Sequence, residues 1–440
     1  MIKKNASELA NDLVDYINKG PTMFNAVQNS IKMLEKNGFK ELDSKNKWKL
    51  EIGGKYYVSV NSSALFAFII NGDRVEEYGF RIIGSHCDSP GYKLKPNPEI
   101  STKNGIKLNV EPYGGMIAST WFDRPLAIAG KVMTKNKANV FSPNEYIINI
   151  KRPVCIIPNL AIHMNRNINS GYEYNQQNDM MPVVLESGEN LEENYILKLI
   201  HKELDEKIEI EDILDFELYL YEYEKGSVVG DCNEFISCGR LDNLASAHSS
   251  ILALIDSSKN KKSEFSGISL VSLFNNEEIG SLSKEGAGSN SLLNIIERIC
   301  ISLNKDREDM LRSFENSFMI SADLAHALHP NKQEKADITN KPIFGKGPTI
   351  KVHAGRAYAS DSFSVAVFKS LCLKNNIDYQ IFVNRSDMKS GSTIGSIITS
   401  SIPIPIVDVG IPILAMHSIR ELAFVDDYMN YYMSMYYFFE

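Results

Sequence analysis

The sequence has 440 residues, 43% of them hydrophobic and 23% charged, which are ordinary values for a globular protein of one large domain or two. Its formal net charge of -8 argues against nucleic acid as the main partner, because phosphate binding needs a basic surface. No stretch reaches the roughly 18 apolar residues of a membrane span, so we expect no membrane partner. The six cysteines are scattered without a C-x-x-C pair, which predicts reduced thiols in a cytoplasmic protein.

The first ninety residues contain two predicted helices followed by predicted strands. Apolar residues at helical spacing predict an amphipathic helix within residues 1–20 and a second helix within residues 20–38, which ends at an Asn-Gly pair. Residues 48–70 are rich in β-forming side chains around a Gly-Gly turn. The apolar run FRIIGSH, residues 80–86, predicts a strand that ends at a histidine.

Residues 92–233 have a different character, with short β-like pieces separated by prolines and asparagine-rich turns. One acidic helical stretch, residues 187–207, precedes a strand at residues 215–222. We interpret this region as a β-rich domain inserted into a discontinuous domain formed by residues 1–91 and 234–440.

After residue 234, helices and strands alternate, which indicates an α/β sheet with helices on its faces. The predicted helices cover residues 243–258, 291–304 and 361–376, the predicted strands cover 266–274, 317–325 and 378–384, and residues 402–418 lead to a last helix.

Histidines and carboxylates recur at the ends of these elements. They are His86 and Asp88 after one strand, Asp242 at a helix start, Glu277 and Glu278 after a second strand, Asp323 after a third, and His417 before the last helix. Ser418 and Glu421 match an S-x-x-E capping box, which predicts that His417 lies at a helix entrance. Because ligands of open α/β sheets gather beyond the carboxyl ends of strands, we expect these side chains to meet.

Imidazole and carboxylate ligands suit zinc, with three protein ligands per ion and one open position. In a site with two ions, Asp242 bridges them, His86 and Asp323 complete one ligand set, and Glu278 and His417 complete the other. Glu277 then faces a bound water as general base. Asp88 is predicted to accept the outer N–H of His86.

Each of these patterns also has an ordinary explanation. A lone His-x-Asp carries little information, and a Glu-Glu pair before glycine is commonly a solvated turn. Asp242 beside Asn243 is typical of a helix cap, and His417 could be a surface histidine. The residues alone leave both explanations open.

Ordered motifs along nearly the whole chain carry a resemblance to a known family. They are GPTMFNAV, YYVSVNSSALFAF, GSHCDSPGYKLKP, TWFDRPLAIAGKV, NLAIHMNR, SCGRLDNLAS, FNNEEIGS, ADLAHALHPN, SGSTIG and DVGIPILAMHSIRE. With them the chain resembles the aspartyl aminopeptidase and aminopeptidase I family of dinuclear zinc exopeptidases. The resemblance implies an α/β zinc-exopeptidase-like catalytic domain with a central mixed sheet, interrupted by a β-rich dimerisation domain. It also implies removal of N-terminal residues from peptide substrates, and a homo-oligomer of dimers that build a tetrahedral dodecamer.

The resemblance implies the same metal ligands, His86, Asp242, Glu278, Asp323 and His417, for two zinc ions per subunit, which cobalt or manganese could replace. It also implies Glu277 as general base and Asp88 as the support of His86. Candidate substrate-binding residues are His163, expected to reach into a neighbouring subunit's site, and His326, His329, Arg356, Asp387, Met388 and Gly391. Each has a plain alternative as an interface, structural, loop or surface residue.

The preferred N-terminal residue stays open. Acid-preferring members of the family use a basic residue in the stretch that here reads IKVHAGRAYASD, where the pattern is shifted and no lysine lies between His353 and Tyr358. Arg356 could pair with a substrate carboxylate. We therefore keep an acidic and a neutral or broad preference as alternatives.

Two rival functions remain at this point. A related two-metal hydrolase, such as a glutamyl aminopeptidase-like enzyme, a carboxypeptidase or a deacylase, would share the ligands but lack the TWFDRPLAIAG and NLAIHMNR motifs. A non-catalytic assembly or cargo protein would be expected to have lost Glu277 or a ligand, and none is missing.

Overall fold

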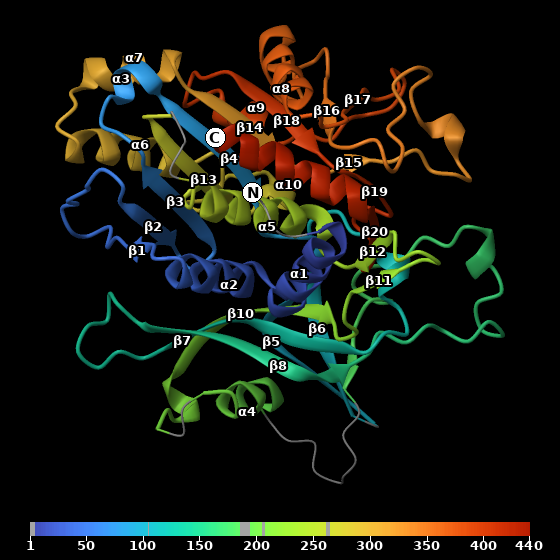
Figure 1. Ribbon diagram of the computed structural model, residues 1–440. Helices are drawn as coiled ribbons and strands as arrows, with labels where there is room; N and C mark the ends of the chain where they lie inside the picture. The colour runs from blue at the N-terminus through green and yellow to red at the C-terminus, as the bar shows by residue number, and fades with distance from the viewer. Residues whose placement is uncertain (1–4, 104, 185–193, 205–206, 261–264) are drawn as a thin grey trace.

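The centre of the structure is a nine-stranded mixed sheet (Figure 1). The computed structural model describes residues 5–103, 105–184, 194–204, 207–260 and 265–440. In spatial order the strands are β1 (Lys40–Glu41), β2 (Lys55–Val60), β3 (Ala64–Ile70), β13 (Ile268–Phe274), β4 (Phe80–His86), β14 (Phe318–Ala322), β18 (Ile406–Gly410), β16 (Thr349–Lys351) and β17 (Gln380–Phe382). The four central strands β13, β4, β14 and β18 are parallel to their neighbours within this group, so their carboxyl ends share one edge.

Helices cover both faces of this sheet. The helices on one face are α1 (Ala6–Lys19), α2 (Met23–Lys36), α5 (Leu241–Ser257), α8 (Ser362–Lys374) and α10 (Val425–Phe439); those on the other are α3 (Val75–Tyr78), α6 (Ser291–Ser302), α7 (Arg307–Glu315) and α9 (Ile394–Ile398). Successive strand residues point to opposite faces, so Ile83 of β4 packs with the first set and Ile82 with the second. Burial on both faces explains why these strands are continuously apolar.

A six-stranded antiparallel sheet forms a second, β-rich part, drawn below α1 and α2 in Figure 1. Its strands are β8 (Asn144–Cys155), β7 (Leu126–Thr134), β10 (Ile213–Glu222), β5 (Gly91–Thr102), β6 (Gly105–Tyr113) and β9 (Val183–Val184), and α4 (Tyr195–His201) packs on it. Helix α4 accounts for part of the predicted acidic helix, of which residues 187–193 and 205–206 lie outside the described residues. Helix α2 contacts β3 of the central sheet as well as β7 and β8, so it lies between the two sheets.

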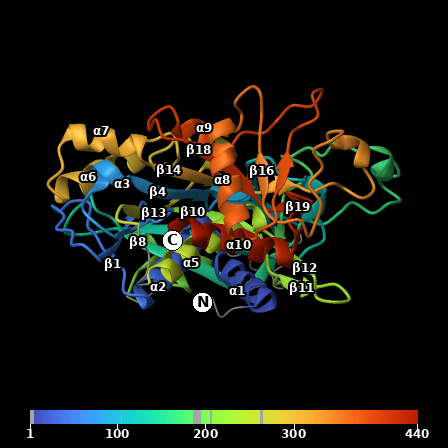
Figure 2. The ribbon, with the colours of Figure 1, turned by 45° about the horizontal axis from the view of Figure 1, so that its top comes forward.

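A third sheet of five short strands lies beside the carboxyl edge of the central sheet. Its strands are β11 (Ser227–Val229), β12 (Phe235–Cys238), β20 (Glu421–Phe424), β19 (Pro412–Leu414) and β15 (Ala325–His326). Short 3-10 turns complete the chain: η1 (Ala118–Trp121), η2 (Ile168–Ser170), η3 (Ile210–Asp212), η4 (Glu277–Ile279) and η5 (Gln333–Lys335). Figure 2 shows the central strands enclosed between helices.

The predicted fold class is confirmed: a mixed α/β fold with a central mixed sheet and a β-rich part between its segments. The boundaries at residues 91 and 233, and the role of the β-rich part in dimerisation, stay predictions. None of the described helices is both long and apolar enough to cross a membrane.

The predicted capping box after His417 is wrong. The last helix, α10, begins at Val425, whereas Glu421 opens strand β20. The Glu421 carboxylate does accept backbone N–H groups, but they belong to Asp242 and His417 and not to a helix that starts at Ser418.

Candidate metal centre

Three neighbouring strands of the central sheet deliver the first group of site residues. Strand β4 ends at His86, the turn after β13 carries Glu277 and Glu278, and Asp323 directly follows β14. Because β13, β4 and β14 are adjacent and parallel, these side chains reach the same edge of the sheet. The structure therefore brings together the side chains that the sequence places after apolar strands.

Asp242 and His417 join this group from outside the sheet. Asp242 lies at the start of α5, where its own backbone is not yet helical, and the helix has no side-chain cap. His417 lies in the turn formed by residues 415–420 between β19 and β20. The ordinary explanation of Asp242 as a helix cap is therefore not supported by its contacts.

The side chains form two groups that share Asp242. His86 Nε2 lies 3.6 Å from Asp242 Oδ1 and 3.7 Å from Asp323 Oδ1. His417 Nε2 lies 3.4 Å from Asp242 Oδ2 and 3.5 Å from Glu278 Oε2. Within each group the possible ligand atoms are all within 4.8 Å of one another. The two oxygens of Asp242 thus face two different histidines.

The donor set fits two zinc ions. Asp242 Oδ1 and Glu278 Oε1 are buried and have no hydrogen-bond partner among the described residues. Buried carboxylate oxygens without a partner are costly, and a divalent cation satisfies them. Each group offers one imidazole nitrogen and two carboxylates, the ligand types that zinc uses when it keeps an open position.

The pKa values of Glu277, Glu278 and His417 are shifted toward their protonated forms, so the cluster favours bound positive charge. Burial, followed by the charges of Asp323 and other carboxylates, raises the pKa of Glu277 to about 7 although His86 acts in the opposite direction. Burial and Asp242 also raise the pKa of Glu278. Burial opposes the charged form of His417, but its contacts with Asp242 and Glu278 prevail and raise its pKa to about 10.

Lys351 distinguishes Asp323 from the other carboxylates. Its Nζ atom is buried and donates to Asp323 Oδ2 and to the carbonyl oxygen of Leu324, both at 3.0 Å. Burial alone would raise the pKa of Asp323, but the Lys351 ammonium and then His86 outweigh it and lower this pKa. Asp323 is therefore held ionised, with Oδ1 left to face His86.

Asp88 connects His86 to the turn that carries the two glutamates. The Nδ1 atom of His86 lies 3.1 Å from the carbonyl oxygen of Asp88 and 3.4 Å from its Oδ1. The Asp88 carboxylate also accepts the backbone N–H groups of Glu277 and Glu278 at 3.2 and 3.1 Å, and the Tyr113 hydroxyl at 2.8 Å. Its contacts therefore orient His86 and hold the glutamate turn at the same time.

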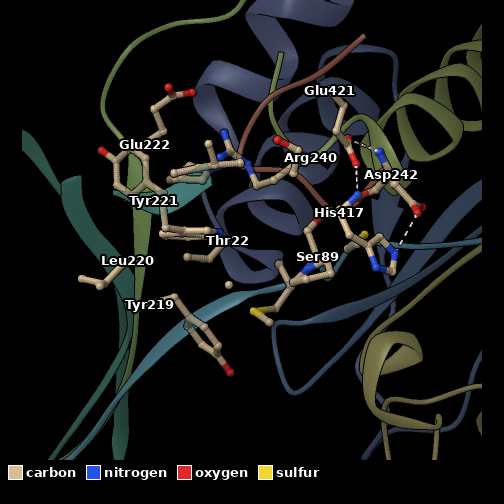
Figure 3. Close-up of a pocket in the computed structure, with 18 residues that line it drawn as sticks. Thr22, Ser89, Tyr219, Leu220, Tyr221, Glu222, Arg240, Asp242, His417 and Glu421 are labelled. Carbon is tan, nitrogen blue, oxygen red and sulfur yellow. Dashed lines mark hydrogen bonds and ion pairs between the residues drawn. The ribbon is translucent and has the colours of Figure 1, made fainter. Parts of the chain in front are cut away.

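Glu421 supports the other pair of ligands from behind, as the dashed lines of Figure 3 show. Its two oxygens accept the N–H of Asp242 at 3.0 Å and the N–H of His417 at 2.8 Å. Burial and the charge of Asp242 raise the pKa of Glu421 to about 8. One carboxylate thus ties together two backbone segments far apart in the sequence.

Of the residues predicted to bind substrate, His326 is close enough to Asp242, Asp323 and His417 for their charges to act on its pKa. It belongs to β15, its ring packs edge-on against Phe382 at 5.8 Å, and desolvation together with the charge of Lys351 lowers its pKa. Its imidazole is therefore neutral at pH 7 and free to donate or accept one hydrogen bond. His329 is exposed, and its Nδ1 accepts the N–H of Asn331 at 3.1 Å.

The other predicted substrate residues are engaged locally or exposed. Arg356 donates to the carbonyl oxygens of Ala359 and Ser360 at 3.1 and 3.3 Å. Asp387 pairs with Arg385 at 2.7 Å, which lowers the pKa of Asp387 to about 2. Met388 and Gly391 are exposed on the same loop, and His163 is exposed on the loop after β8. The structure of one chain does not bring these residues into the ligand cluster, so their roles stay predictions.

Sequence reasoning missed three supporting residues. Lys351 carried a usable signal, because a lysine inside an apolar strand-like run (TIKV) is unusual unless its charge is paired. Glu421 was noticed but was given a local role. For Tyr113, nothing in the neighbouring sequence pointed to Asp88.

Nearly the whole chain is similar to known proteins. Residues 16–439 match the family described as aminopeptidase I zinc metalloprotease (M18). A probable M18 family aminopeptidase 2 from Clostridium novyi (strain NT) is 51% identical over 427 residues, covering 97% of this chain and 97% of the relative. A probable aspartyl aminopeptidase from Ricinus communis is 37% identical over 465 residues, covering 98% and 94%.

Solved structures give the same result. The cryo-EM structure of the Ape4 and Nbr1 complex contains a chain that matches with a TM-score of 0.93 at 34% identity, covering 100% of this chain and 87% of that chain. The structure of the S. cerevisiae mApe1 dodecamer matches with a TM-score of 0.83 at 27% identity, covering 99% and 96%.

Proposed function

The chain belongs to the aminopeptidase I zinc metalloprotease family (M18) and is a zinc aminopeptidase, and on this premise we propose that it uses two zinc ions. The proposed ligands are His86 and Asp323 for one ion, Glu278 and His417 for the other, and Asp242 between them. The observation that carries the proposal is that the two oxygens of Asp242 face two separate histidines, at 3.6 and 3.4 Å. Cobalt or manganese is proposed to substitute for zinc.

The proposed reaction is hydrolysis of the peptide bond after the N-terminal residue. When bound, the zinc ions would acidify a bridging water and polarise the scissile carbonyl. Glu277 is the proposed general base, since its carboxylate lies 3.9 Å from His86 Nε2 and is assigned as a ligand to neither ion, which leaves it to accept a proton from water. Water adds to the carbonyl carbon, the C–N bond breaks, and the proton accepted by Glu277 passes to the departing amine. Asp88 is proposed to support the reaction by orienting His86 and the glutamate turn.

The proposed substrates are peptides with an acidic or a neutral N-terminal residue. The name of the Ricinus communis relative, a probable aspartyl aminopeptidase, supports the acidic choice. Arg356 is the candidate for pairing with an acidic substrate side chain. Its guanidinium already bonds to carbonyl groups of its own loop, which favours a neutral preference. His326, with its neutral imidazole, is the proposed substrate contact beside the ligands.

We further propose a cytoplasmic homo-oligomer in which the β-rich part contacts a second subunit. The dodecamer described for S. cerevisiae mApe1 supports this assembly, and a tetrahedral arrangement of six dimers is the proposed form. The exposed position of His163 leaves it available to a neighbouring subunit's site. Light scattering of the purified protein would measure the assembly directly.

Two measurements test the proposed function. Elemental analysis of the purified protein is expected to give two zinc ions per chain, and chelation is expected to abolish activity that zinc, cobalt or manganese restores. A panel of aminoacyl-anilides, compared with their N-blocked analogues, is expected to yield turnover only of the free amines and to rank the N-terminal residues. Turnover of only the blocked compounds would instead indicate a deacylase or another two-metal hydrolase.

A further inference from the structure

The 415–420 turn, which carries His417, has an unfavourable backbone conformation. Ala415 and His417 have φ values of 57° and 66°. These values lie in the left-handed region, which residues other than glycine adopt only at a cost in free energy. Such a conformation persists only where surrounding contacts hold it. The position of the His417 imidazole therefore depends on whatever holds this turn.

A loop of the β-rich part makes the nearest of these contacts. The loop follows β6 and covers residues 114–117. Ile117 donates its N–H to the carbonyl oxygen of His417 at 2.9 Å, and His417 Nδ1 lies 2.8 Å from the carbonyl oxygen of Gly115. This contact places the ring proton on Nδ1 and leaves the Nε2 lone pair free for a metal ion.

The same loop touches Glu278, the other ligand of this half. Gly114 has a φ of 68°, and a Cβ atom added to it would come within 3.1 Å of Glu278 Cβ. A side chain at position 114 is therefore disfavoured both by the backbone conformation and by this close approach, and the loop lies against both Glu278 and His417.

The end of the turn is fixed to the β-rich part as well. Ile419 donates its N–H to Thr120 Oγ1 at 3.0 Å, and its side chain is buried in the hydrophobic core of the six-stranded sheet. Arg420 pairs with the buried carboxylate of Glu222 at 2.9 Å, and Arg124 binds the same carboxylate. These contacts anchor the turn at several points to residues of the insertion.

The other half of the centre is supported differently. Asp323 is held by Lys351 of β16, and His86 by the carbonyl oxygen of Asp88, which are residues of the central sheet and the segment that follows β4. The His86–Asp323 group therefore depends mainly on the central sheet and the segment after β4, whereas His417 depends on the β-rich part. Glu278 is held from both sides, because Asp88 accepts its backbone N–H.

We propose that the β-rich part positions His417 and Glu278 through the 114–117 loop and the Arg420–Glu222 ion pair, and that these contacts set the affinity of one metal site but not of the other. The proposal rests on the proposed dinuclear function. Arg420 and Glu222 are positioning residues, which act on the metal site through the 415–420 turn. Any partner or assembly contact that shifts the β-rich part would then change occupancy of the Glu278–His417 site first.

The test is titration of metal-free protein with Co²⁺, followed by calorimetry and by the visible absorption of bound cobalt. Arg420→Gln is expected to weaken one of two equivalents about 10- to 100-fold and to leave the other unchanged. His417→Gln identifies the affected equivalent, because it removes a proposed ligand of that site. Glu222→Gln removes the same ion pair from its other side and is expected to give the same result.

Lys305→Gln is the matched control. Its ion pair with Glu76 is equally short, at 2.9 Å, and similarly shielded, but it contacts none of the proposed ligands. It is expected to lower thermal stability without changing either metal affinity. The inference is overturned if Arg420→Gln and Glu222→Gln keep both affinities, or weaken both equivalents equally. Wild-type protein that binds fewer than two equivalents would refute the proposed dinuclear function itself, and this inference with it.

Discussion

The two halves of the metal centre use the same kinds of ligand but are built in different ways. His86 and Asp323 extend from adjacent parallel strands, where the geometry of the sheet fixes their separation. Glu278 and His417 lie in turns, and much of their support comes from the β-rich part. A buried ammonium, Lys351, compensates Asp323, whereas Glu278 has His417 as its ion-pair partner.

This difference separates two requirements of a metal site. Secondary structure is sufficient to bring ligands to one place when they end neighbouring strands. Ligands in turns need additional contacts, and here those contacts come from a part of the chain with its own hydrophobic core. The second half of the centre is therefore open to influence from outside the catalytic sheet.

The largest expected effect comes from a residue that is a ligand in neither half. Glu277→Gln should retain both metal equivalents and reduce kcat about 10²- to 10⁴-fold, because the amide cannot accept the proton of the attacking water. Steady-state kinetics and metal titration of the same preparation would measure both quantities. Glu285→Gln is the control, since Glu285 is a buried glutamate that binds Asn61. Near-normal turnover of Glu277→Gln would show that another group is the base.

The next largest effect should be a loss of metal affinity that is confined to the His86–Asp323 half of the centre. Lys351→Met removes the hydrogen bond that orients the Asp323 carboxylate and should, through this loss of orientation, weaken the His86–Asp323 equivalent about 10- to 100-fold, the counterpart of Arg420→Gln. Cobalt titration would identify the equivalent that changes. Lys131→Met, which removes a buried lysine paired with Glu217 at 3.0 Å in the β-rich part, is the matched control. If Lys351→Met weakened the same equivalent as Arg420→Gln, the division into two halves would be wrong.

Removal of the metal should expose a pH dependence of stability. In the metal-free chain the pKa of Glu277 is about 7 against an ordinary 4.5, and that of His417 is about 10 against 6.5, so the folded state binds more protons than the unfolded state across neutral pH. Stability must then fall as pH rises through this range. The lowered pKa of Asp323 acts with the opposite sign but only in acid, below its ordinary value of 3.8.

Thermal unfolding would measure this effect. With a chelator, Tm is expected to decrease between pH 5.5 and pH 8.5, while the zinc-loaded protein should depend on pH much less over the same range. A Tm of the chelated protein that rises with pH would contradict the assigned shifts. Because Lys351 compensates only one half, we expect Lys351→Met to steepen the decrease further.

Local sequence patterns were sufficient to predict the ligands that end strands. An apolar run followed by a carboxylate or a histidine marks the carboxyl edge of a parallel sheet, which is why His86, Glu278 and Asp323 were placed together. The same reasoning failed at Glu421, because the S-x-x-E pattern suggested a local helix cap. The groups that Glu421 binds are the N–H of Asp242, 179 positions away, and the N–H of His417.

The supporting contacts could not be predicted from single segments. Gly115, which accepts from His417, is 302 positions away from it, and the meeting of the two depends on how the β-rich part packs against the 415–420 turn. No periodicity or capping rule contains that information. Lys351 was also missed, although an isolated lysine in an apolar strand indicates a buried partner.

The smallest predicted effect tests whether the division between the halves is complete. Tyr113, at the end of β6, donates its hydroxyl to Asp88 at 2.8 Å and accepts from Asn276 at 3.0 Å, so the β-rich part also reaches the His86 side through one hydroxyl. Tyr113→Phe should lower kcat less than about tenfold with both metal equivalents retained, because Asp88 keeps its two backbone N–H donors.

Tyr92→Phe is the control for this change, since the Tyr92 hydroxyl lies in the same β-rich part and binds Gln176 at 2.8 Å, away from the ligands. Equal kinetics of the two variants would mean that the Tyr113 hydroxyl has no part in orienting Asp88. If Tyr113→Phe instead lost one metal equivalent, the Tyr113 hydroxyl would be essential for metal binding. In that case the β-rich part would control both halves, and the central sheet alone would be insufficient to hold either ion.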